Sequence, residues 1–182
     1  MCIYSEFIAN GVKESFFMLT SEPAEDFRAE ASALLDRYYI EMADRGTSPA
    51  NEFMIRFHLS DIYVQQPVLE EMLGPRDSFV SCVGQASAHG GRLAMEAWHI
   101  SGAKKKLVRS AETQSLTMEL QNYWLLIFRK MSLNSVGSHD QMTEEFSSLG
   151  KELRSKRGKL SENTVRTWIY CRDVDNNYSG LV

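Results

Sequence analysis

The sequence of 182 residues predicts an α+β protein of two tandem units, each a mixed or antiparallel sheet packed by helices. Three observations support this fold class: two amphipathic helical stretches, several segments that alternate apolar and polar residues, and a repeat of both at one spacing. We expect the first unit, residues 1–102, to be complete. The second unit, residues 103–182, is expected to lack its last two strands.

The first helix is predicted in the stretch "SEPAEDFRAEASALLDRYYIEMADRG". Pro23 suits a first helical turn and Gly46 suits the C-terminal cap. A strand should follow over residues 51–61, because apolar residues alternate there with polar ones. The helix is expected to bury the stripe Phe27, Ala31, Leu34, Tyr38 and Met42 against the strand residues Phe53, Ile55, Phe57 and Leu59.

A second helix is predicted between Ser138 and Gly158. Ser138 and Gln141 have the spacing of a capping box, and Gly158 is expected to end the helix. A strand over residues 164–171 should follow it. The apolar stripe of this helix is Met142, Phe146, Leu149 and Leu153.

The two helices belong to matching stretches of sequence. Gly158, Asn163 and Asp173 follow Gly46, Asn51 and Asp61 at one constant interval along the chain, and Phe128 follows Phe16 at the same interval. We interpret this as an internal duplication. The first unit then continues into two strands, "DSFVSCVGQ" and "RLAMEAWHI", joined by the turn "ASAHGG", for which the second unit has no counterpart. Either this chain is shortened, or another chain supplies the missing edge.

Composition excludes several classes of protein. The net charge of −4 and the pI of about 5.6 argue against a protein built around a nucleic-acid-binding surface. No run approaches a membrane span, and no signal-like segment opens the chain, so we expect a cytoplasmic protein. Cys2, Cys82 and Cys171 are expected to be free thiols. We expect no cofactor and no metal, because His58 and His99 lack ligand spacing and a structural or surface role suits them better.

Glu96 stands out within "RLAMEAWHI". On an extended chain its side chain shares a face with Ala94, Trp98 and Ile100. A carboxylate beside these apolar residues is costly unless a partner or a ligand compensates it. The residue is either an edge-strand glutamate that reaches water or part of a binding site.

The segments "FMIRFHLSDI", "DSFVSCVGQ" and "RLAMEAWHI", together with "TVRTWIYCRDVDNNYSGLV", resemble the RidA (YjgF) superfamily. This superfamily also carries the labels endoribonuclease L-PSP and translation initiation inhibitor. The resemblance implies chorismate-mutase-like units with the order strand, strand, helix, strand, helix, strand, strand. The tandem arrangement is similar to that of the chorismatase branch, in which the chemistry resides in terminal strands of the second unit.

The resemblance also implies a site between subunits, where an Arg binds a substrate carboxylate and a Glu positions the water that hydrolyses an enamine or imine. Glu96 matches the catalytic Glu, and Ser81 and Cys82 match pocket residues. The family Arg falls on Val80, which cannot bind a carboxylate. Three arginines are candidates for binding the substrate: Arg76, Arg92 and Arg166.

Each assignment has a structural alternative. Cys82 could equally be a small buried apolar residue, and Arg166 could be a solvent-exposed arginine.

The function that the resemblance implies is a deaminase (hydrolase) acting on a small carboxylic-acid or imine metabolite. The protein would be a homo-oligomer, dimer or trimer, and would bind neither nucleic acid nor membrane. A chorismatase-like protein and a non-catalytic binding or assembly module remain alternatives.

Overall fold

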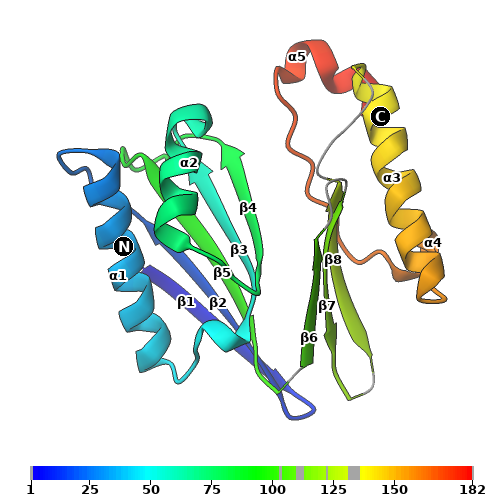
Figure 1. Cartoon of the computed structure of the whole chain (residues 1–182), viewed down its shortest axis with the longest axis horizontal. Helices are drawn as coiled ribbons and strands as arrows, with labels where there is room; N and C mark the ends of the chain where they lie inside the picture. Colours follow the sequence, from blue (N-terminus) through cyan, green and yellow to red (C-terminus); the bar gives the residue numbers. More distant parts are fainter. Residues whose placement is uncertain (1, 103, 110–112, 122, 131–135, 182) are drawn as a thin grey trace. The chain divides into compact units, whose positions relative to one another are not determined.

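The computed structural model describes residues 2–102, 104–109, 113–121, 123–130 and 136–181 (Figure 1). It divides into two compact units, Met1–Leu107 with Leu116–Leu126, and Val108–Ser115 with Ile127–Val182. Our boundary at residues 102 and 103 stays a prediction. None of the helices in the described ranges combines the length and hydropathy that crossing a bilayer requires.

The first unit contains a five-stranded mixed sheet in the order β1-β2-β5-β3-β4. Neighbouring strands are antiparallel except β3 and β4, which are parallel and joined by α2. The α+β prediction is therefore confirmed, as is the order of strands and helices in this unit. Its elements are β1 (Cys2–Ala9), β2 (Val12–Thr20), α1 (Phe27–Asp44), η1 (Pro49–Asn51), β3 (Glu52–Leu59), α2 (Ile62–Leu73), β4 (Phe79–Gly84) and β5 (Leu93–Ile100).

A second sheet has the order β6-β7-β8, and helical segments follow it in the chain. Its first strand includes the lysine run 104–106. The elements are β6 (Lys104–Arg109), β7 (Thr113–Glu119), β8 (Trp124–Lys130), α3 (Ser138–Ser155), α4 (Leu160–Asn163), α5 (Val174–Asn177) and η2 (Tyr178–Gly180).

Helix α1 begins and ends at side-chain and backbone signals. The carboxylate of Asp26 accepts a hydrogen bond from the Ala29 N–H at 2.8 Å, so the helix starts after Pro23 rather than around it. At the other end Gly46 adopts a φ of 65°, a conformation that glycine reaches at little cost. The Thr47 N–H then donates to the Met42 carbonyl, which closes the helix as predicted.

Helices α1 and α2 lie on one face of the five-stranded sheet and share its apolar core (Figure 1). Most of the predicted packing between α1 and β3 is confirmed. Burying one large apolar side chain completely stabilises the folded state by about 1.5–3 kcal/mol. Phe53 is the exception, because a register shift between Glu52 and Met54 turns it toward Trp98, 4.9 Å away between ring centroids. The buried core includes Phe17, Leu19, Ala31, Leu34, Leu35, Tyr38, Met42, Ile55, Phe57, Leu59, Leu69, Leu93, Met95 and Ala97.

A buried polar layer closes one end of this core. The imidazole of His99, which is 1% exposed, is hydrogen-bonded to the Tyr38 hydroxyl at 2.6 Å and to the Thr47 hydroxyl at 2.9 Å. Burial lowers the pKa of His99 to about 4, and the positive charges of Lys105 and Arg76 act in the same direction. His99 is therefore a neutral structural residue at pH 7.

The helices of the two units match at an interval one residue shorter than the one expected from the sequence. Helix α1 begins at Phe27 and α3 at Ser138, and they end at Asp44 and Ser155. The caps match at this shorter interval too: Gly158 donates its N–H to the carbonyl of Leu153 as Thr47 does to that of Met42. The left-handed residue that corresponds to Gly46 is Arg157, with a φ of 62°.

One additional residue after α3 restores the interval that the sequence predicted between Asn51 and Asn163. Asn51 accepts a hydrogen bond from the Ser48 N–H at 3.2 Å, and Asn163 accepts one from the Lys159 N–H at 2.8 Å. Each asparagine thus accepts a bond from the backbone N–H that precedes a short helical segment, three residues earlier for Asn51 and four residues earlier for Asn163. The predicted capping box is wrong, because Gly137 is the N-cap and the Gln141 side chain donates to the Val136 carbonyl instead.

The predicted strand over residues 164–171 is also wrong. These residues adopt neither helix nor strand, and 164–170 are exposed. In the first unit the matching strand, β3, is hydrogen-bonded to β4 and β5, which both follow it in the chain. The described part of the second unit has no counterpart of either strand, and an isolated strand leaves its backbone groups without sheet partners.

The His99 environment predicts a pH dependence of stability. The folded-state pKa of about 4 lies below the usual 6.5, so the unfolded chain takes up a proton first as pH falls. The free energy of unfolding should therefore lose about 3 kcal/mol between pH 6.5 and pH 4 through this residue. Urea denaturation should show a smaller loss over this range in His99→Gln. His89→Gln, at an exposed loop position, should keep the wild-type profile; equal profiles for all three proteins would contradict this role.

Candidate functional site

The candidate site is built around Glu96 on the central strand of the first sheet. Strand β5 places Glu96 opposite Met18 of β2 and Arg56 of β3. Its neighbours Met95 and Ala97 point into the helix-covered core, so Glu96 points to the other face of the sheet. The face that the sequence predicted for Glu96 is thus confirmed.

Two basic side chains of β3 hold the Glu96 carboxylate. Nη1 of Arg56 lies 3.3 Å from one carboxylate oxygen, and Nε2 of His58 lies 3.1 Å from the other. The side chain of Arg56 is only 5% exposed and that of His58 15%, whereas that of Glu96 is 36% exposed. The carboxylate is therefore fixed by groups of the sheet and open to solvent on one side.

Glu96 lies at a boundary on this face of the sheet. On β3 and β4 the side chains of Met54, Phe79 and Val83 are buried. On β2 the side chains of Phe16 and Met18 are 37% and 53% exposed. A ligand that reaches Glu96 from the β2 side would therefore meet both apolar surface and a partly exposed carboxylate that is paired with a buried Arg56.

This arrangement has the parts of a proton-transfer site. Arg56 keeps its charge at any physiological pH and so favours the ionised form of a neighbouring carboxylate. Histidine is the side chain that most readily takes up and releases a proton near neutral pH. A carboxylate that accepts hydrogen bonds from both residues can orient a water molecule while the imidazole exchanges a proton with a ligand.

The structure separates the predicted pocket residues on β4. Cys82 pairs in register with Phe57, and both Val80 and Cys82 pack against the helix-covered core. Ser81 pairs with Arg56 and therefore lies on the Glu96 face. Cys82 does not join Glu96, because one residue along a strand reverses the direction of the side chain.

The three arginines that were predicted to bind substrate each contact a different side chain of the protein. Arg76 donates two hydrogen bonds to the buried carboxylate of Glu52, at 2.6 and 2.8 Å. Arg92 forms an ion pair with buried Glu30 at 3.1 Å. Arg166 lies in the second unit, where its guanidinium stacks over the Trp168 ring at 5.2 Å. A fourth arginine, Arg56 of β3, is the one that forms an ion pair with Glu96.

Arg56 and His58 are the site residues that sequence reasoning missed. Both belong to the alternating segment "FMIRFHLSD", on the face opposite to its core residues. The sequence did contain a signal for the site: two basic residues, two positions apart, on the outer face of the interior strand β3. Pairing that strand with the one that carries Glu96 would have brought the three side chains together.

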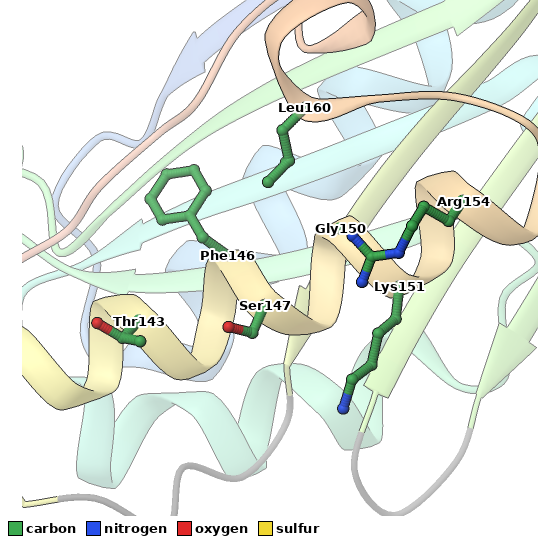
Figure 2. A pocket seen from close by; sticks show the side chains of 7 residues that line it. All are labelled: Thr143, Phe146, Ser147, Gly150, Lys151, Arg154 and Leu160. Atoms are coloured by element: carbon green, nitrogen blue, oxygen red, sulfur yellow. The ribbon is translucent and has the colours of Figure 1, made fainter.

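A separate hollow of about 450 Å³ lies along α3 in the second unit, and Figure 2 shows its side chains. Its lining includes two cations, Lys151 and Arg154, but no carboxylate or histidine, so it lacks a general base of the kind seen at Glu96. Within the described ranges no cluster of three or more His, Cys, Asp or Glu residues is arranged to hold a metal ion. The hollow is lined by Thr143, Phe146, Ser147, Gly150, Lys151, Arg154 and Leu160.

The partly buried ion pair of Arg56 and Glu96 predicts a stability difference between two glutamates of the same face. Glu96→Gln removes the charge that compensates buried Arg56 and should lower the free energy of unfolding by about 1–2 kcal/mol. Glu14→Gln is the matched control, because Glu14 accepts a hydrogen bond from the neutral Trp98 indole at 3.1 Å, which an amide oxygen can also accept. Its cost should stay below about 0.5 kcal/mol in urea denaturation. Equal losses in the two variants would show that the charge of Glu96 has no special role.

No protein-family model matches this chain, and no curated protein matches it. Among solved structures, a YjgF/YER057c/UK114-family protein of Mycobacterium tuberculosis is 20% identical, with a TM-score of 0.38 over 46% of this chain and 77% of that one. Yeast Mmf1 is 17% identical (TM-score 0.41; 52% and 83% of the two chains) and RidA of Psychrobacter is 16% identical (0.41; 52% and 84%). At these identities and TM-scores they assign no activity to this chain. The solved structures to which this chain is similar thus include members of the superfamily that its sequence resembles.

Proposed function

We propose that the first unit hydrolyses a reactive enamine or imine of a small carboxylic acid, with Glu96 as the catalytic residue. The observation that carries this proposal is the Glu96 carboxylate, fixed by buried Arg56 and by His58 on a partly exposed face. The superfamily resemblance of the sequence favours the same reaction class. We place the protein in the cytoplasm, where its three cysteines would stay reduced.

The reaction divides between the two titratable groups. His58 donates a proton to the nitrogen of the imine, and Glu96 accepts a proton from the water that attacks the imine carbon. The proton on Glu96 then passes to the amine nitrogen of the carbinolamine, ammonia leaves, and His58 takes up the hydroxyl proton, which gives the ketone and restores both side chains. The sum is one imine and one water converted to one ketone and one ammonia, with no oxidant or cofactor. An enamine enters the same path after protonation at carbon.

Arg56 acts on this reaction through Glu96 as a positioning residue. Its guanidinium lies within the sheet, 3.3 Å from the Glu96 carboxylate, and compensates that charge beside the apolar side chains of Met18 and Trp98. Arg56 thus places a cation of β3 on the Glu96 face of the sheet, whereas Val80 of β4 packs against the helix-covered core.

Ammonia release from freshly generated 2-aminoacrylate tests this function. Glu96→Gln should lower the rate at least about 100-fold, because general base catalysis is lost. His58→Gln should lower it by about 10–100-fold, because the proton donor to the imine nitrogen is lost. Cys82→Ser is the control, since Cys82 lies on the core side of the sheet, and it should keep the wild-type rate. A wild-type rate no higher than background, or loss of activity only in Cys82→Ser, would overturn the proposal.

A second function, assembly through the same face, is favoured by its exposed apolar side chains. Ile3, Phe7, Phe16 and Met18 of β1 and β2 are 51%, 60%, 37% and 53% exposed. The registers of these two strands place them on the Glu96 side of the sheet. A clustered apolar surface of this kind is typical of a protein–protein contact. We propose a homo-oligomer, dimer or trimer, with Glu96 near the junction.

Sedimentation at micromolar concentration tests the assembly. The wild-type protein should sediment as a dimer or trimer, and Phe7→Asp with Met18→Asp should shift it to a monomer, because the charges would be buried without partners. Val64→Asp is a matched control on α2, where Val64 is 67% exposed and on the other side of the sheet. A wild-type monomer, or equal dissociation by Val64→Asp, would contradict the proposal.

A further inference from the structure

Two cations of α3 are the feature of the second unit that the proposed function leaves without a role. Lys151 and Arg154 line the hollow of about 450 Å³, and neither forms an ion pair within the described part of the chain. The hollow therefore carries two positive charges that no described side chain compensates. The other lysines of this unit are paired with carboxylates: Lys130 with Glu144 at 2.7 Å, Lys156 with Glu152 at 3.9 Å and Lys159 with Glu162 at 2.6 Å.

The hollow has a polar side and an apolar side. Ser147 and Lys151 are four residues apart on α3, so they lie one above the other on the same face of the helix. Phe146 and Leu160 of α4 are half-buried. Figure 2 shows these two apolar side chains together above the helix, with Ser147 and Lys151 below them. A molecule in the hollow therefore contacts a ring and methyl groups on one side and a hydroxyl and an ammonium group on the other.

Gly150 lies between these two sides. It is a buried residue inside α3, although glycine is a weak helix former. A Cβ atom at this position would lie 3.3 Å from Nη1 of Arg154 and 3.3 Å from Cδ1 of Leu160. The guanidinium of Arg154 therefore lies over the helix backbone, beside the apolar side of the hollow. The missing side chain leaves space next to this guanidinium for the charged end of a ligand.

We propose that this hollow binds a phosphate monoester of a small aromatic or branched alcohol. Such a phosphate carries close to two negative charges at neutral pH and three acceptor oxygens, which matches two cations that lack carboxylate partners. Arg154 can donate two parallel hydrogen bonds to the phosphate, and Lys151 adds a point charge. Phe146 and Leu160 would pack against the apolar group, and the volume suits a small ligand. The proposed hydrolysis uses residues of the first unit, so neither test depends on the other.

Titration of the full chain with phenyl phosphate, followed by amide NMR shifts, tests the ligand class. The salt concentration is kept at about 50 mM, because salt screens exposed charges. The amides of residues 146–154 and of Leu160 should shift. Phenyl phosphate should bind at least about tenfold more tightly than inorganic phosphate or benzyl alcohol, because each of these lacks one half of the ligand. Phenylacetate, which has a phenyl ring but a single negative charge, should bind at least about threefold more weakly than phenyl phosphate.

Variants of single cations locate the bound phosphate. Lys151→Gln and Arg154→Gln change exposed side chains, so the fold should persist, and each should weaken the binding of phenyl phosphate at least about fivefold. Arg154→Lys keeps the charge but loses the planar fork, and it should still weaken binding about threefold. Lys156→Gln is the matched control, because it makes the same change of charge on the C-cap residue of α3, outside the lining of the hollow.

The control Lys156→Gln should stay within about twofold of the wild-type affinity. An equal loss in Lys156→Gln and Lys151→Gln would show attraction by net charge alone and would overturn the proposal. Shifts outside residues 146–160, or equal affinities for phenyl phosphate and inorganic phosphate, would overturn it as well. Binding of phenylacetate as tight as that of phenyl phosphate would overturn the assignment of a phosphate.

Discussion

The first unit depends on the hydrogen-bonding of β5 to two strands that are not otherwise neighbours. Strand β2 pairs with one of its edges and β3 with the other, and in the sheet order β5 alone lies between them. The apolar core repeats this dependence, because Met95 and Ala97 lie between the side chains that β2 and β3 contribute. In the second unit, where no such strand is described, the segment that corresponds to β3 loses its strand geometry while the helices keep theirs. Helices satisfy their own backbone, whereas strands rely on neighbours.

The same central position makes β5 a suitable carrier for Glu96. A residue in the middle of a five-stranded sheet has its backbone fixed on both sides, so its side chain can be held by groups from a neighbouring strand without the mobility of a loop. Arg56 and His58 use this arrangement from β3, and they reach the carboxylate from the buried side of the face. The cost of a charge among Trp98, Met18 and Ile100 is offset by two ionic or hydrogen-bonded contacts.

Local patterns predicted the parts of the fold that are locally determined. The stripe of α1, its Gly46 cap and the face of Glu96 each follow from a few consecutive residues. Phe53 was misplaced because a register shift opposite Trp98 has no signature in the sequence of β3 alone. The 164–171 segment has the composition of a strand but not its neighbours. Arg56 and His58 are far from Glu96 in the sequence, so their contact with it becomes visible only once strand pairing is known.

The order in which the strands leave the ribosome has a consequence for synthesis of this protein. Strand β5 is the last strand of its sheet to emerge, although it occupies the middle. Until Ile100 is outside the exit tunnel, β2 and β3 cannot be joined, and Phe17, Ile55 and Phe57 remain without their final cover. The nascent chain therefore carries exposed apolar segments for most of the translation of the first unit, and it is during this interval that chaperone binding or aggregation competes with folding.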